Sequence, residues 1–169
     1  MTSAPTPLMA AEIDALAHSK LRALLRHWQD RRTDGAIPDR TLLDPIALAP
    51  WLGNLLLIEC LEGERFRYRL YGTGFVEAFG REWTGHDLAE LPPDQYARLR
   101  EEYLATLAAG QPTCRRHRAR FTVPLPGGAQ PSGDVEMTWE RLVLPLADHA
   151  GGVTLLLVGA FALPEEGEA

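Results

Sequence analysis

The sequence has few cysteines and no long apolar run, which argues against a disulfide-stabilised protein and against a membrane-spanning one. Its 169 residues include two cysteines, Cys60 and Cys114, which are far apart and form no Cys-x-x-Cys pair. Isolated thiols are typical of reducing compartments, so no structural disulfide is expected. No apolar run reaches the roughly 18 residues that span a membrane, and the N-terminus lacks the basic-then-apolar order of a signal peptide. We therefore expect a cytoplasmic protein without a membrane partner.

Positive charge is also in short supply. The formal net charge is −6 at neutral pH. Nucleic-acid binding proteins contact phosphates through a basic surface, so nucleic acid is not an expected partner. The hydrophobic share of 46% is enough for one domain with its own core.

Residues for catalysis or metal binding do not occur in recognisable arrangements. No serine stands in a Gly-x-Ser-x-Gly turn. Histidines, cysteines and carboxylates are not clustered at the spacing of metal ligands. We expect no catalytic residues and no metal site. An enzyme that uses Tyr96, His86 and Asp87 as acid–base groups remains an alternative, although no spacing argument brings the three together.

Hydrophobic periodicity predicts a mixed α+β chain. Apolar residues three to four apart indicate an amphipathic helix from residue 11 to about 32. Asp44 and Pro45 are typical of a helix start. The remaining expected elements are strands at 55–60 and 66–71, a short helix at 75–80, a longer helix at 94–109, and strands near 113–123, 135–146 and 153–163. A loop at 124–133 separates two of these strands.

The stretch FRYRLYGTG, from Phe66 to Gly74, alternates apolar and charged residues before it breaks at two glycines. Strand alternation places Phe66, Tyr68 and Leu70 on one face and Arg67, Arg69 and Tyr71 on the other. Gly72 and Gly74 are expected to end the strand, because glycine is free to adopt positive φ angles.

Several of these segments together resemble a PAS domain. They are LRALLRHW at 21–28, Asp44-Pro45, FRYRLYGTG, Trp83-Thr84-Gly85 and ERLVLPL at 140–146. More narrowly, the chain resembles a family of mostly uncharacterised bacterial single-domain PAS-like proteins. The resemblance implies a five-stranded antiparallel sheet with short helices over one face and an N-terminal helix. It divides the chain into a tail and amphipathic helix (1–35), a PAS-like domain (36–164) and an acidic tail (165–169).

The resemblance also implies a sensory or protein-interaction module rather than an enzyme. Haem-binding PAS domains generally place their axial histidine on the long helix before the third strand, and residues 94–109 contain none. His86 and His117 are isolated and are more simply structural. Light-sensing PAS domains hold flavin beside an Asn-Cys-Arg-type motif, which neither cysteine has. Haem and flavin are therefore not supported, and the cofactor stays unknown.

An aromatic interior is what remains as a candidate site. We expect a small-molecule pocket between sheet and helices, and the alternative is that the same side chains simply fill the core. The candidate pocket residues are Tyr68, Phe75, Phe79, Trp83, Tyr96, Tyr103, Met137 and Trp139.

The N-terminal helix is a candidate dimer interface. Its apolar residues Leu21, Leu24, Leu25 and Trp28 can pack on the chain's own sheet or on a second copy. We predict a homodimer that signals to another protein when a small molecule binds. The alternative is a ligand-free interaction module with no catalytic activity.

Overall fold

The computed structural model describes residues 3–7, 13–122 and 134–164 and contains one antiparallel sheet. All five predicted strands are present, and a short sixth strand lies at the edge. In the sheet order β1-β4-β5-β6-β2-β3, the strands are β1 (Thr6–Pro7), β4 (Thr113–Thr122), β5 (Asp134–Ala147), β6 (Val153–Leu163), β2 (Leu55–Leu61) and β3 (Arg65–Tyr71). The predicted loop at 124–133 and the acidic tail at 165–169 lie outside the described residues.

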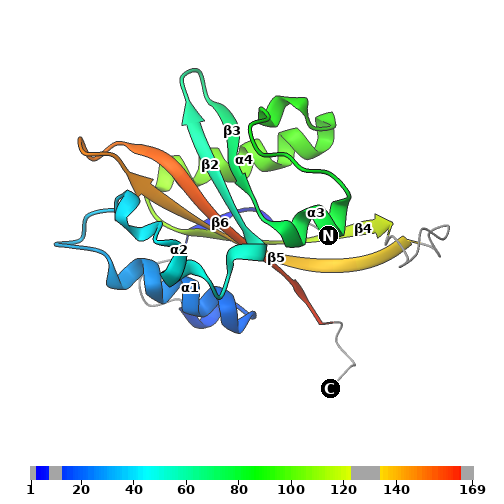
Figure 1. Ribbon diagram of the computed structural model, residues 1–169, viewed down its shortest axis with the longest axis horizontal. Coiled ribbons are helices and arrows are strands. Elements are labelled where there is room, and N and C mark those ends of the chain that lie inside the picture. Colours follow the sequence, from blue (N-terminus) through cyan, green and yellow to red (C-terminus); the bar gives the residue numbers. More distant parts are fainter. Residues whose placement is uncertain (1–2, 8–12, 123–133, 165–169) are drawn as a thin grey trace.

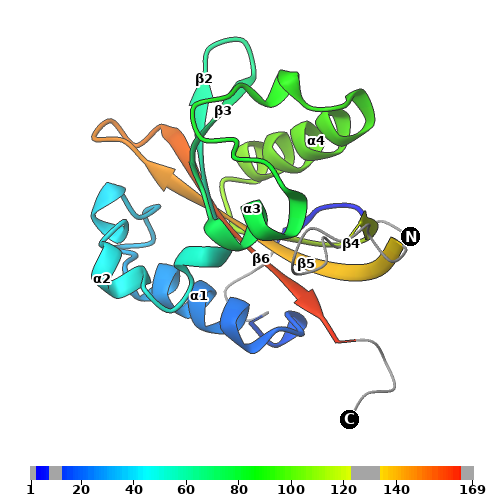
Figure 2. The same cartoon turned by 45° about the vertical axis from the view of Figure 1, so that its right-hand side comes forward.

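Helices cover both faces of the sheet (Figures 1 and 2). On one face lie α1 (Ser19–Asp30) and α2 (Pro45–Leu48), and on the other lie α3 (Thr73–Phe79) and α4 (Pro93–Ala109). The Asp44 side chain caps α2 by accepting a 3.0 Å hydrogen bond from the Ile46 amide, as its sequence predicts. The lid over one face is formed by α3 and α4, and α1 adds a second layer behind the sheet.

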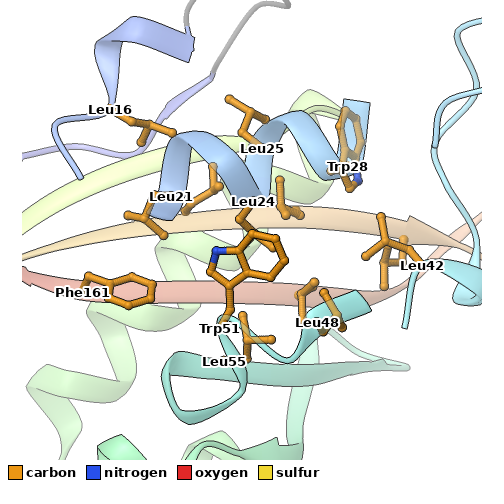
Figure 3. Packing of buried hydrophobic residues seen from close by; sticks show 14 of the residues in the cluster. Leu16, Leu21, Leu24, Leu25, Trp28, Leu42, Leu48, Trp51, Leu55 and Phe161 are labelled. Atoms are coloured by element: carbon orange, nitrogen blue, oxygen red, sulfur yellow. The ribbon is translucent and has the colours of Figure 1, made fainter. Parts of the chain in front are cut away.

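The apolar face of α1 packs on the chain's own sheet (Figure 3). Leu21, Leu24, Leu25 and Trp28 are each at most 2% exposed. The Trp28 indole also donates a 2.8 Å hydrogen bond to the Pro145 carbonyl of β5. The expectation that these four side chains form a dimer interface is therefore wrong for this structure, because they are buried in the core of their own chain.

Burial on both faces also explains the apolar sequence of the central strand β6. Gly159 lies on this strand beneath α1, and a Cβ there would come within 2.7 Å of a Leu24 methyl group. The missing side chain lets the helix approach the sheet closely. A strand covered on both faces reads as a nearly continuous apolar run, as in Leu155 to Ala160.

Two glycines at the end of β3 are needed for close approach and not for their φ angles. Gly72 has a φ of −61°, and Gly74 has no positive φ either, so neither residue uses the freedom of glycine to adopt positive φ. A Cβ on Gly72 would lie 2.5 Å from the Gly53 carbonyl oxygen, and one on Gly74 would lie 2.7 Å from the same atom. The backbone before β2 thus packs directly against the start of α3, which holds that helix over the sheet.

Candidate functional site: a pocket between the sheet and α3 and α4

A pocket of about 230 Å³ lies between the inner face of the sheet and the helices α3 and α4. Five strands of the sheet contribute residues to it: β2, β3, β4, β5 and β6. The lining residues are Leu56, Tyr68, Tyr71, Phe75, Phe79, Gln95, Arg98, Leu99, His117, Trp139, Arg141 and Ala160.

One wall of the pocket is aromatic. The ring centroid of Trp139 lies 6.1 Å from that of Phe75 and 5.9 Å from that of Phe79. Tyr71 continues the wall, 5.6 Å from Phe75 and 5.4 Å from Tyr68. These are the separations of favourable offset and edge-to-face aromatic contacts.

A β-bulge places Tyr71 in this wall. Between β2 and β3 the register shifts, so that Leu57 pairs with Leu70 while Ile58 pairs with Tyr68. The extra residue on β3 reverses the alternation beyond it. Leu70 consequently points outward and is 39% exposed, whereas Tyr71 packs in the inner core. The simple alternation expected from the sequence was wrong for these two residues.

Charged residues lie in and next to the pocket lining. Arg141, on β5, is 7% exposed and Glu102, on α4, is 1% exposed. The Nε atom of Arg141 lies 3.0 Å from each carboxylate oxygen of Glu102, and its Nη2 donates a 3.2 Å hydrogen bond to the Tyr103 hydroxyl. Burial lowers the pKa of Arg141, but the Glu102 carboxylate and the Tyr103 oxygen more than offset this effect and raise it.

Arg98 Nε and His117 Nδ1 are buried in the pocket lining and have no hydrogen-bond partner among the residues that the structure describes. Unpaired buried polar atoms are rare in folded proteins and require an explanation. Burial, followed by the charges of Arg141, Arg98 and Arg115, lowers the pKa of His117 to about 3. The imidazole is therefore neutral near pH 7.

Four of the eight predicted pocket residues line the pocket: Tyr68, Phe75, Phe79 and Trp139. Trp83 and Met137 lie in the surrounding inner core. Tyr103 is fully buried behind the pocket, where it contacts Phe66 and Arg141. Tyr96 packs against the same core from α4 and lines a separate hollow with Arg100 and Leu104.

The prediction missed the polar lining residues, although strand parity contained a signal for one of them. Trp139 was expected inside, and Arg141 is two residues further along the same strand, hence on the same face. His117 stands opposite Trp139 in the register of β4 and β5. An interior arginine was not expected because buried guanidinium groups require a partner, and Glu102 is distant in sequence.

A family model described as a PAS domain matches residues 16–162. The chain belongs to the PAS domain family. PAS domains are sensory modules that bind small molecules. The match begins at Leu16 and so includes α1, which packs in the same core as the sheet. No protein with a curated description matches the sequence closely enough to count as a relative.

Solved structures similar to this PAS chain include light-oxygen-voltage proteins. An RNA-binding light-oxygen-voltage receptor shares 14% identity at a TM-score of 0.49, covering 96% of this chain and 38% of that longer chain. A light-oxygen-voltage domain from a study of a flavin analogue shares 15% identity at a TM-score of 0.43, with 76% and 88% coverage. A fungal light-oxygen-voltage photoreceptor shares 18% identity at a TM-score of 0.40, with 92% and 100% coverage.

The residues of this PAS pocket do not fit a photoactive flavin or a haem. Cys60 lies on β2 and Cys114 on β4, and neither lines the pocket. Burial raises the pKa of the Cys60 thiol to about 12, which keeps it unreactive. His117 is the histidine of the lining, but a volume of about 230 Å³ is too small for a porphyrin.

The structure does not bring Tyr96, His86 and Asp87 together as an acid–base site. The His86 Nδ1 atom lies 2.9 Å from a Glu90 carboxylate oxygen, and Asp87 forms a 2.7 Å ion pair with Arg65. Tyr96 lines a separate hollow on α4. Within residues 3–7, 13–122 and 134–164, no group of three potential ligands could hold a metal ion, and no helix there could cross a bilayer.

The buried His117 should make the stability of this domain depend on pH. Its pKa is about 3 in the folded protein, against 6.5 as the reference value. The unfolded chain therefore binds the proton more readily than the folded protein. The contribution of neutral His117 to the free energy of unfolding is fully present above pH 6.5 and is lost as the pH falls towards 3. At about pH 5 the loss from this one group should be about 2 kcal/mol.

Urea unfolding at about pH 7 and pH 5 measures this effect against a His117→Asn variant. We expect the fall in the free energy of unfolding between the two pH values to be about 2 kcal/mol smaller in the variant. The pKa of His18 is also lowered by burial, and its contribution cancels because both proteins contain it. Equal falls in the two proteins would show that His117 titrates normally.

Proposed function

We propose that this PAS domain is a sensory module that binds a small molecule in the pocket and signals through contacts with another protein. The observation that supports this most is that buried nitrogen atoms of Arg98 and His117 in the cavity lining have no hydrogen-bond partner within the described part of the chain. A core that only packs would either satisfy such atoms or replace them with apolar groups. Groups that await a ligand explain why Arg98 Nε and His117 Nδ1 stay unpaired.

The size of the pocket limits the ligand class. A cavity of about 150 Å³ accepts a benzene-sized molecule, whereas drug-sized ligands occupy at least about 300 Å³. A pocket of about 230 Å³ therefore suits one aromatic ring with a polar substituent. The aromatic wall around Phe75 and Trp139 offers faces and edges on which such a ring can pack.

Phe79 connects the pocket with the outer surface of the protein. It lines the pocket from the last turn of α3, yet it is 41% exposed. A ligand that displaces Phe79 changes both the pocket and the outer surface that a partner protein would contact. We propose that the partner, or a second copy of the chain in a homodimer, detects this change at α3 and that the protein acts in the cytoplasm.

A binding role fits the pocket better than catalysis. A general base works best with a pKa near the operating pH. The pKa of His117 is about 3, and burial raises the pKa of Tyr71 to about 12. Neither group is suited to exchange protons at neutral pH, so we propose that the pocket recognises its ligand without transforming it.

Thermal unfolding of the purified full chain with a panel of single-ring compounds tests this proposal. A compound at one hundred times its Kd should stabilise the protein by about 2.7 kcal/mol, or roughly 5–10 °C in Tm for a domain of this size. The same compounds are then tested on the variant Ala160→Leu. Ala160 lies on β6 and lines the pocket, so the larger side chain should occupy the ligand's space and abolish the shift.

Ala162→Leu is the matched control, because Ala162 lies two residues further along the same strand and does not line the pocket. It should retain the ligand-induced shift. The proposal fails if no compound raises the Tm of the wild type, or if Ala160→Leu keeps the full shift.

A further inference from the structure

We infer that the ligand carries an anionic group, a carboxylate on a single aromatic ring, and that Arg98 recognises it together with His117 and Arg141. This inference rests on the proposed function, since it names the chemistry of the ligand in the same pocket. It starts from the charges around the polar end of the cavity.

Three guanidinium groups meet near this end, and the described residues neutralise only two of them. Arg141 pairs with Glu102. Arg115 lies 2.8 Å from a Glu101 oxygen and also donates to the carbonyls of Ser3 and Arg98. Arg98 forms no ion pair among the described residues, and the nearby carboxylates of Glu102 and Asp94 only partly offset its repulsion by the other two arginines.

The position of Arg98 makes its isolation costly. It lines the pocket beside Arg141, and its Nε atom is buried with no hydrogen-bond partner. Burial, followed by repulsion from Arg141 and Arg115, lowers its pKa. A guanidinium nevertheless stays charged in proteins. A bound anion would remove the repulsion and satisfy the donor at once.

His117 supplies the second donor for this anion. It is 8% exposed, lines the same pocket and has a buried Nδ1 atom with no partner. The arginines disfavour its protonation, so the imidazole is neutral and can carry one proton on Nδ1. Donors from a helix residue and a strand residue therefore converge on one small volume, which is how sites for carboxylates are built.

The aromatic side chains of the lining select what the anion is attached to. Phe75, Phe79 and Trp139 line the same pocket as Arg98 and Arg141 and offer apolar ring surface. The pocket thus combines aromatic and cationic lining residues within about 230 Å³. A benzoate-like molecule matches both kinds of lining residue, because it joins an apolar ring to a carboxylate.

Three probes separate these contributions: benzoate, its neutral isostere benzamide, and acetate, which has the charge but no ring. Calorimetric titration of the full chain at fixed ionic strength should show benzoate binding at least tenfold more tightly than either of the others. The Arg98→Gln variant should lose that preference over benzamide. The matched control is Arg100→Gln on the same helix, whose side chain pairs with Glu64 outside the pocket and which should keep the preference.

The outcomes distinguish this inference from the proposed function. Benzamide binding as tightly as benzoate, or an Arg98→Gln variant that retains the preference, overturns the inference and leaves a ligand pocket standing. Acetate binding as tightly as benzoate overturns the aromatic part of the ligand class. Binding of none of the three probes overturns the inference, and a failed thermal-shift panel would then remove the proposed function as well.

Discussion

Glu102→Ala should lower the free energy of unfolding by about 3–5 kcal/mol, because it leaves a buried guanidinium without its counter-charge. Glu102 is 1% exposed and lies 3.0 Å from the Nε atom of Arg141. In the variant, Arg141 would keep its 3.2 Å hydrogen bond to the Tyr103 hydroxyl, which carries no charge to offset the guanidinium. Urea unfolding at about pH 7 measures the difference.

Two further variants decide whether charge burial causes this loss. Glu64→Ala removes an exposed partner of Arg100 and should cost no more than about 1 kcal/mol. The double variant Glu102→Leu/Arg141→Met replaces the buried pair with apolar side chains and should recover most of the stability. A double variant less stable than Glu102→Ala would contradict the account, since the pair would then stabilise through its shape and not through neutralisation.

Trp28→Ala should be comparably damaging, with a loss of about 3–5 kcal/mol from the cavity it creates. Trp28 is 2% exposed beneath the sheet, and its indole donates a hydrogen bond to Pro145. The change also leaves that carbonyl without its donor. Chemical unfolding measures the effect, with Ile46→Ala as the control. Ile46 is 86% exposed, so its truncation should change stability by less than about 0.5 kcal/mol.

The same variant tests the role of α1. If the helix belongs to the core of its own domain, Trp28→Ala lowers the stability at every protein concentration and leaves the oligomeric mass unchanged. A normal free energy of unfolding combined with a loss of dimer mass in sedimentation would instead place Trp28 at an interface between two copies.

The fold could be read from the sequence to the extent that it depends on local patterns. Alternation in FRYRLY predicted β3, and Asp44-Pro45 predicted the start of α2. Periodicity cannot decide what covers an apolar face, however. The apolar face of α1 could pack on a sheet or on a second helix equally well. Only the tertiary structure shows that Gly159, which has no side chain, lets α1 approach the sheet closely.

The pocket was predictable on its aromatic side and not on its polar side. Aromatic residues are expected in an interior, so Phe75 and Trp139 followed from their positions on expected elements. Tyr71 did not, because a one-residue bulge turned it inward. The burial of Arg141 depends on a carboxylate 39 residues away, and no local pattern links the two.

A crystal structure of the full chain with 4-bromobenzoate tests the central claim most directly, because the anomalous signal of bromine locates the ligand without interpretation of weak density. The account predicts a bromine peak between α3 and the sheet, near Phe75 and Trp139, with the carboxylate within hydrogen-bond reach of Arg98 and His117. A pocket filled by repacked side chains, or bromine bound only elsewhere on the surface, would contradict it.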